Sequence, residues 1–403
     1  MSGPSRLRLH LSPAAVRAVR HGHPWIYPDR IRTHNRPGDI GDLAALYDPQ
    51  DRFLGLGFFD PESPIRVRVL HAGPRVTLDD AWWSRHLDQA LERRLPFFDP
   101  ALTTGWRCLH GENDGWPGLV LDRYHDRFVL KLYSTVWLPR LEPVVALLVH
   151  RLHPRSLILR LSRNIAPLAR DRFHRRDGDT LAGEPVTEPV VFLEHGLRFE
   201  ADPVRGQKTG FFLDQRDNRH LVGSLAAGAA VLNAFSFSGG FSLHAARGGA
   251  LSITDLDISP HALAAARRNL ALNQHLPEVS AARHETVQAD TFDWLAQSTA
   301  RSFDLVILDP PSMARRSDER DGALAAYARL ARLGAPRVRP RGWFVAASCS
   351  AHVAAPDFFE TVRRETRRSG LRFTEWRTTG HPLDHPATFP EAHYLKAIYL
   401  RRL

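Results

Sequence analysis

A pair of glycines and a pair of carboxylates in this chain could together bind a nucleoside. Gly239 and Gly240 follow a short apolar run, and Asp255 and Asp257 close the next one. Paired glycines let the backbone approach a ligand closely where a helix begins, and a carboxylate at the tip of the next strand can accept hydrogen bonds from both ribose hydroxyls. We prefer Asp257 to Asp255 for this role. Asp257 is followed by Ile258-Ser259-Pro260 and a helical run, which predicts that it lies in a loop.

These residues belong to a segment, Val231 to Asp257, that predicts a strand, a glycine turn, a helix and a second strand. Such a segment is half of a nucleoside-binding βαβ unit, in which the acid follows the first strand by about 20 residues. Phe235 and Phe237 stand where the G-x-G-x-x-G motif would carry glycines, so a ligand without pyrophosphate is favoured over a dinucleotide. The alternative is an ordinary α/β turn. The turn residues expected to contact a bound ligand are Asn233, Phe235, Ser238 and Gly239.

Two further acids follow apolar runs. Asp290 comes after the run at Val287 and suits the amino edge of an adenine. The continuous apolar run Phe303–Leu308 predicts a buried parallel strand, and Asp309-Pro310-Pro311 follows it. The prolines fix the backbone and present a carboxylate and carbonyl groups at the carboxyl edge, where open α/β sheets bind their ligands.

A thiol is predicted to lie at the same edge. The strand Trp343–Ala347 ends in Ser348-Cys349-Ser350. Cys349 could be a nucleophile, or it could be a small buried hydrophobic residue; the flanking serines favour a polar site. The other cysteine, Cys108, is distant in sequence, so we expect no disulfide framework, no cysteine-based zinc site and a reducing, cytoplasmic compartment.

The composition indicates a globular protein with a polyanionic partner. The chain has 403 residues, enough for two or three domains, and 43% of them are hydrophobic. Lysine and arginine number 54 against 44 acids, which gives a formal net charge of +10. Nucleic acid is the partner that such a charge favours, although codon bias toward arginine would have the same effect. No apolar run approaches the roughly 20 residues that span a bilayer.

The chain is expected to contain three domains. Residues 1–72 predict a small β-rich domain with one helix, Pro13 to Arg20, and a strand that places Arg66 and Arg68 on one face. With the Gly22-His23-Pro24-Trp25 turn, this part resembles the PUA domain, an RNA-binding barrel in which both arginines would contact RNA. A generic barrel with a solvated basic face is the alternative. Residues 74–200 predict an α+β connecting domain, and residues 203–403 alternate strand and helix as in a doubly wound, mostly parallel α/β sheet.

Two polar segments precede or open the last domain. Eight arginines against one acid, Asp171, lie between Arg151 and Arg176; they form either a phosphate-facing surface or a mobile charged loop. The segment Val204–Arg219 concentrates Gly, Lys, Gln and Arg before a helix. We found no core requirement for this concentration, so the segment is expected to cover a cofactor or substrate through Lys208, Gln215 and Arg216.

Essentially the whole chain resembles the bacterial class I S-adenosylmethionine-dependent methyltransferases that carry an N-terminal PUA domain and methylate cytosine C5 in 23S ribosomal RNA. The motifs that carry the resemblance are Lys208–Arg219, Asn233–Ser242, Asp309–Ser312, Ser348–Ser350 and His393–Lys396. The resemblance implies S-adenosylmethionine as cofactor and ribosomal RNA as partner. We also expect no metal, and the sequence leaves open whether the chain forms a homodimer. It also implies that Cys349 attacks the base, Asp309 binds the pyrimidine edge beside Pro310 and Pro311, and Asp257 and Asp290 bind the cofactor.

The implied chemistry needs a nucleophile because cytosine C5 does not attack a sulfonium methyl group unaided, whereas thiolate addition to C6 makes C5 enamine-like. Met313 stands where the family usually has Phe, and Ala351 where a second histidine is common, which puts the base pocket in question. One alternative is a guanine or adenine amino-group methyltransferase, although Ser312 replaces the aromatic residue expected after the prolines. The other is a non-catalytic RNA-binding assembly factor.

Overall fold

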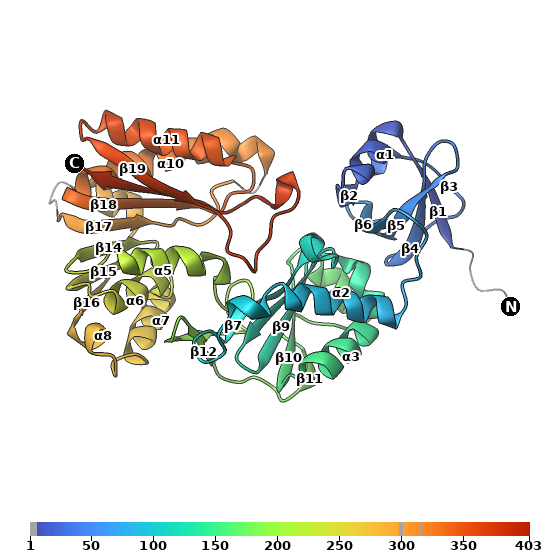
Figure 1. Cartoon of the computed structure of the whole chain (residues 1–403), viewed down its shortest axis with the longest axis horizontal. Coiled ribbons are helices and arrows are strands. Elements are labelled where there is room, and N and C mark those ends of the chain that lie inside the picture. Colours follow the sequence, from blue (N-terminus) through green and yellow to red (C-terminus); the bar gives the residue numbers. More distant parts are fainter. Residues whose placement is uncertain (1–5, 298–300, 315) are drawn as a thin grey trace. The chain divides into compact units, whose positions relative to one another are not determined.

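The computed structural model describes residues 6–297, 301–314 and 316–403 (Figure 1). Contacts divide the chain into two compact units. Unit 1 comprises residues 1–191, 201–211 and 384–389, and unit 2 comprises residues 192–200, 212–383 and 390–403. Within the described ranges, no helix is both long and apolar enough to cross a membrane.

The N-terminal part of unit 1 is a six-stranded sheet with strand order β2-β6-β5-β4-β1-β3. Helix α1 (Pro13–Arg20) has the predicted bounds because Ser12 caps its N-terminus and proline occupies its first position. A short 3-10 helix spans Pro28–Arg30. The strands are β1 (Leu7–Leu11), β2 (Trp25–Ile26), β3 (Ile31–His34), β4 (Asp42–Tyr47), β5 (Phe53–Phe59) and β6 (Val67–Ala72).

A five-stranded sheet, order β11-β10-β9-β8-β7, forms the rest of unit 1. Phe58 and Leu70 from the first sheet belong to the same apolar core as this second sheet, together with the buried Trp116 and Trp137. The expected first and second domains therefore share one core. The strands are β7 (Gly105–His110), β8 (Leu119–Tyr124), β9 (Arg127–Leu132), β10 (Ser156–Leu161) and β11 (Thr180–Gly183); the helices are α2 (Asp80–Glu92), α3 (Leu141–Leu152) and α4 (Ala166–Phe173).

The sheet of unit 2 has seven strands in the order β16-β15-β14-β17-β18-β20-β19. The first five are parallel, and β20 is antiparallel to both β18 and β19, which confirms the predicted mostly parallel sheet. The strands are β14 (Ala230–Ala234), β15 (Ser252–Asp257), β16 (Arg283–Gln288), β17 (Phe303–Leu308), β18 (Val338–Ser348), β19 (Phe373–Thr379) and β20 (Lys396–Arg402). A separate hairpin pairs β12 (Val190–Glu194) with β13 (Leu197–Ala201).

The helices of unit 2 pack against this sheet. Helices α10 and α11 contact each other and the β17, β18 and β20 side, while α5 packs on α6 (Figure 1). The helices are α5 (Arg216–Ser224), α6 (Gly240–Arg247), α7 (Pro260–Ala271), α8 (Pro277–Ala281), α9 (Thr291–Ala296), α10 (Arg320–Gly334) and α11 (Ala355–Arg368).

Parallel pairing brings the predicted site residues to one edge. In the register, Ala234 pairs with Leu308 and Leu256, and Leu308 pairs with Ala346. Each strand ends within a few residues of these pairs. The residues that follow the strands, among them Asp309 and Cys349, therefore lie at the carboxyl edge of one sheet.

The arginine-rich segment between Arg151 and Arg176 is ordered structure, so its interpretation as a mobile loop is wrong. It contains β10 and α4, and six of its eight arginines pair with acids. Most of these acids come from elsewhere in the chain, which the local acid count could not show. The pairs are Arg151–Asp88, Arg155–Glu184, Arg160–Asp177, Arg170–Asp171, Arg172–Glu62 and Arg175–Glu142.

Candidate active site

The turn between β14 and α6 has a strained backbone. Gly239 has φ +73°, and a Cβ atom there would lie 2.8 Å from the Cβ of Ala266, so the position accepts only glycine. Phe235 and Phe237 also have positive φ values, 59° and 48°. Non-glycine residues rarely hold this conformation, and such strain is concentrated at ligand sites.

Three buried polar atoms on this turn have no hydrogen-bond partner among the described residues. They are Asn233 Oδ1, Ser236 Oγ and Ser238 Oγ. Buried polar groups are nearly always paired, so the turn fits a ligand that supplies polar groups of its own. Ser236 is one that the sequence did not single out.

Asp255 and Asp257 differ in what already surrounds them. Asp255 is fully buried and accepts hydrogen bonds from Asn233 Nδ2 at 3.1 Å and from the Ser242 hydroxyl, and it contacts His284 Nε2 at 2.8 Å. Asp257, the last residue of β15, is half-buried. These surroundings assign Asp255 to the core and leave Asp257 as the better ligand residue.

The backbone also fixes Asp257 in place. Its Oδ2 accepts from the Phe237 amide at 2.9 Å, and its Oδ1 accepts from the Ser259 amide at 2.8 Å. The carboxylate is thereby joined to the glycine turn, and each oxygen has a second lone pair for a ribose hydroxyl.

Asp290 is exposed and has a local role that the sequence did not show. Its carboxylate accepts from the Asp293 amide at 3.1 Å and caps the N-terminus of α9. Its contact with an adenine stays a prediction.

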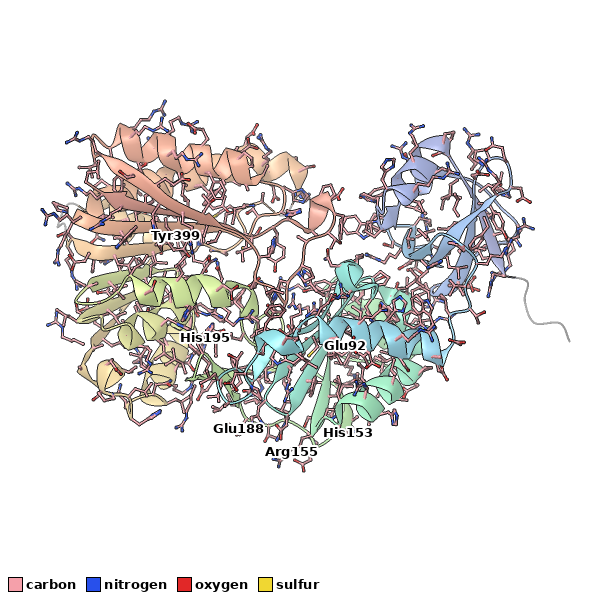
Figure 2. All side chains as sticks on the ribbon, in the orientation of Figure 1. Glu92, His153, Arg155, Glu188, His195 and Tyr399 are labelled. Carbon is pink, nitrogen blue, oxygen red and sulfur yellow. The ribbon has the colours of Figure 1, made fainter. Side chains whose placement is uncertain are left out.

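Asp309 is held by a chain of amide side chains. Its Oδ1 accepts from Gln215 Nε2 at 2.9 Å, and Gln215 Oε1 accepts from Asn218 Nδ2 at 2.6 Å. Asn218 Oδ1 accepts from Thr379 Oγ1 at 2.6 Å and from the Tyr399 hydroxyl at 3.0 Å. Tyr399, in β20, is labelled in Figure 2. Burial raises the pKa of Tyr399, so its hydroxyl stays protonated and donates. This chain fixes the orientation of Gln215 and directs its NH2 group at Asp309.

The two prolines after Asp309 differ in exposure. Pro310 is buried, whereas Pro311 is exposed, so Pro311 is the one whose ring is accessible to a base. Ser312 Oγ donates to the carbonyl of Ala314 at 3.0 Å, which continues the turn.

Cys349 follows β18 and is half-buried. Its two neighbouring serines, Ser348 and Ser350, are fully buried. Ser350 Oγ accepts from the Met313 amide at 3.0 Å and lies 2.8 Å from the Tyr327 hydroxyl, which also accepts from Ser348 Oγ at 2.9 Å. These bonds join the loop after the prolines to the residue that carries the thiol.

Cys108 contrasts with Cys349. It is fully buried in unit 1, and this burial raises the pKa of its thiol. In the described part of the chain, no group of three or more His, Cys, Asp or Glu side chains could hold a metal ion.

The Val204–Arg219 segment does meet core requirements, contrary to expectation. In unit 1, the buried Thr209 donates to Asp122 Oδ2 at 2.6 Å. Lys208 has a positive φ of 53° and is half-buried, and its carbonyl accepts from Lys131 Nζ at 3.0 Å. Some of the polar residues in this segment therefore stabilise the fold.

The same is true in unit 2. Arg219 forms a buried two-pronged ion pair with Glu194, at 2.7 and 2.6 Å, and His244 Nε2 lies 3.0 Å from the same carboxylate. Arg216 is buried at the first position of α5, with its Nε 3.4 Å from Asp217. Among the residues predicted here to bind the cofactor, Gln215 donates a hydrogen bond to Asp309.

The prediction that Arg68 lies on an exposed basic face of residues 1–72 is wrong. Arg68 is buried and forms an ion pair with Glu112, which also accepts from Trp25 Nε1 at 2.8 Å. Arg66 is half-buried and donates to the carbonyl of Asp60 at 3.2 Å. Glu112 comes from the 3-10 helix Gly111–Asp114, which follows β7, so strand alternation alone could not reveal the pairing.

Family comparisons agree with this geometry. Residues 163–401 match the S-adenosylmethionine-dependent methyltransferase family, and residues 9–72 match the PUA-like domain. Among solved structures, a putative S-adenosylmethionine-dependent methyltransferase from Streptococcus mutans superposes with a TM-score of 0.82 at 22% identity, covering 98% of this chain and 99% of the other. This likeness supports the fold.

Relatives match along the whole chain. A ribosomal RNA large subunit methyltransferase of Deinococcus radiodurans is 53% identical over 411 residues, covering 100% of both chains. The ribosomal RNA large subunit methyltransferase I of Shewanella denitrificans is 32% identical over 409 residues, covering 98% of this chain and 99% of the other. The chain therefore belongs to the S-adenosylmethionine-dependent methyltransferase family, with a PUA-like domain at its N-terminus and S-adenosylmethionine as its cofactor.

Proposed function

We propose that this protein methylates C5 of a cytosine in the 23S ribosomal RNA of the large subunit, and that Cys349 forms a transient covalent bond to C6 of that base. The substrate class is supported by the names of its full-length relatives. The observation that carries the mechanism is the half-buried thiol of Cys349, which follows β18, while Asp309 follows the neighbouring strand β17.

The β14–α6 turn and Asp257 would hold the cofactor. The unpaired oxygens of Asn233, Ser236 and Ser238 suit the polar groups of a bound nucleoside and amino acid. Asp257 suits the ribose hydroxyls. When bound, the cofactor supplies a methyl group on a sulfonium centre.

Cys349 and Asp309 would act on the base. The thiolate adds to C6 and forms an S–C6 bond, and the electron pair of the C5–C6 double bond makes C5 nucleophilic. After C5 gains the methyl group, it loses its proton, the S–C6 bond breaks and the thiolate is restored. Asp309, whose orientation Gln215 fixes, binds the N3 or N4 edge of the pyrimidine.

Covalent trapping tests this proposal. Ribosomal RNA containing 5-fluorocytosine at the target should form a denaturant-resistant adduct with the wild-type enzyme and cofactor, because fluorine cannot leave as a proton does. Cys349→Ala should bind cofactor and RNA, form no adduct and transfer no radioactive methyl group.

The matched control is Cys108→Ala, because Cys108 lies buried in unit 1. It should form the adduct and transfer methyl groups as the wild type does. A fully active Cys349→Ala protein would contradict C5 methylation. It would favour transfer to an exocyclic amino group, which Asp309 could bind without a nucleophile.

A further inference from the structure

Lys396, the first residue of β20, is a buried cation. Its side chain is 2% exposed, and its Nζ donates to the carbonyls of Ser350 and Val353, both at 2.5 Å, and of Tyr394 at 3.1 Å. Among the described residues, no carboxylate lies within ion-pair distance of this ammonium. Lys396 is thus held by dipoles alone.

A buried ammonium without a carboxylate destabilises a fold, because desolvation of the charge is only partly offset by carbonyl groups. An apolar side chain would fill the same space at lower cost. Burial lowers the pKa of Lys396 to about 8, which leaves the ammonium mostly protonated at pH 7. A role in the site would explain why a cation occupies this position.

The ammonium lies at the turn that carries the thiol. Lys396 pairs with Ser348 in the β18–β20 register, and Cys349 is the next residue along the chain. One carbonyl that Lys396 binds belongs to Ser350, on the other side of Cys349. A negative charge on Cys349 raises the pKa of Lys396, and because Coulomb attraction is mutual, the ammonium stabilises a thiolate on Cys349.

We propose that Lys396 is the positioning residue for Cys349: it fixes the turn after β18 and, as a cation, holds the sulfur as a thiolate ready to add to the base. The thiol proton passes to solvent, and a thiolate–ammonium pair remains. The role of that thiolate rests on the proposed function. The activation of the thiol itself is measurable without RNA.

Other titratable groups on the surrounding elements do not replace this cation. Burial raises the pKa of Tyr327 on α10, so it stays neutral, and Asp309 after β17 is an acid. His352 in the turn and His393 before β20 are both exposed to solvent, which screens any charge they carry.

The pH dependence of alkylation tests the proposal. The full-length protein would be treated with iodoacetamide between pH 5.5 and 10, and the alkylated Cys349 peptide quantified by mass spectrometry. In the wild type, the midpoint of reactivity should lie at least about one pH unit below the ~8.5 of an ordinary thiol. Lys396→Met should raise this midpoint by about one unit or more.

Lys131→Met is the matched control. Lys131 is a half-buried lysine that also donates to a carbonyl, and burial also lowers its pKa to about 8, but it belongs to unit 1. This variant should keep the wild-type midpoint. At pH 10, all three proteins should react at similar rates, because the thiol is then ionised in each.

A wild-type midpoint at or above ~8.5 would overturn the proposal. An alkylation rate that changes by the same factor at every pH in Lys396→Met would also overturn the proposal, since that result indicates a structural role alone. If Lys396→Met does not fold, as judged by circular dichroism, the alkylation midpoint of the wild-type protein alone tests the proposal. The 5-fluorocytosine experiment tests the proposed function, and the alkylation experiment tests the role of Lys396. Because neither result depends on the other, failure of one proposal can be distinguished from failure of the other.

Discussion

Asp255 and Asp257 are two residues apart, and their different surroundings predict different effects of substitution. Asp257→Ala should weaken cofactor binding by about 1–3 kcal/mol, roughly 5- to 150-fold, because charge-assisted hydrogen bonds to the ribose are lost. Calorimetric titration with S-adenosylhomocysteine would measure the loss. Asp255→Asn should instead lower the free energy of unfolding, because it disturbs the buried contacts with Ser242 and His284. If Asp257→Ala binds S-adenosylhomocysteine with unchanged affinity, then another residue binds the ribose.

A histidine cluster around Glu194 predicts acid sensitivity. His195, which is labelled in Figure 2, stacks on His220 with ring centroids 4.4 Å apart. Burial, together with the charge of His220, lowers the pKa of His195 to about 4. Other groups facing it are Glu194, which raises the pKa of His195, and His244 and Arg216, which lower it.

The folded protein therefore binds this proton less tightly than the unfolded chain, whose histidine pKa is ~6.5. The contribution of His195 to stability is complete above pH ~6.5 and is lost as the pH falls toward 4. The melting temperature, followed by circular dichroism, should fall less steeply over this range in His195→Asn than in the wild type. Asparagine tolerates the positive φ of 50° at this position. Equal slopes in the two proteins would contradict the assignment.

The individual residues of the site were more predictable than their partners. Asp257, Asp309 and Cys349 could be located because each follows an apolar run, and parallel strands end at one edge. The bond between Gln215 and Asp309 joins residues 94 positions apart, and no local pattern encodes it.

At the scale of elements, the site depends on the junction between the loop after β17 and the turn after β18. Tyr327→Phe removes the hydroxyl that contacts both Ser348 and Ser350 and leaves buried polar groups unpaired. The free energy of unfolding should fall by about 1–3 kcal/mol in urea denaturation. Tyr133→Phe, at a tyrosine that is 43% exposed, is the control and should change it little. A comparable decrease in the free energy of unfolding in both variants would mean that the Tyr327 hydroxyl contributes no more to stability than an exposed hydroxyl does.

Elements with strong local signals were predicted with nearly correct bounds. Helix α1 and strand β17 match their predicted ranges because a cap and a continuous apolar run determine them. Strand β7 was missed, since its polar residue Arg107 pairs with Asp122, which lies on the next strand and is distant in sequence. Helix α2 begins at Asp80 because Asp79 caps its N-terminus.

At the scale of the molecule, the sequence suggested three consecutive domains, whereas contacts group residues 384–389 with unit 1. Asp384 Oδ2 accepts from the Arg107 amide at 2.9 Å, and the Thr388 amide donates to Asn113 Oδ1 at 2.8 Å. A segment between β19 and β20 thus belongs to the N-terminal unit. Order along the chain could not reveal this grouping, because the bonded residues are more than 270 positions apart.

The net charge of +10 leads to a prediction about RNA binding. Affinity for ribosomal RNA should fall at least about tenfold between 50 and 200 mM salt, because phosphate contacts release counterions. Filter binding would measure this fall, and S-adenosylhomocysteine affinity, which depends on buried contacts, should change little over the same range. Salt-independent RNA affinity would argue against a phosphate-binding surface. Salt is a better test than deletion of residues 1–72, because that deletion would remove Phe58 and Leu70 from the core of unit 1 and so disturb the fold as well as RNA binding.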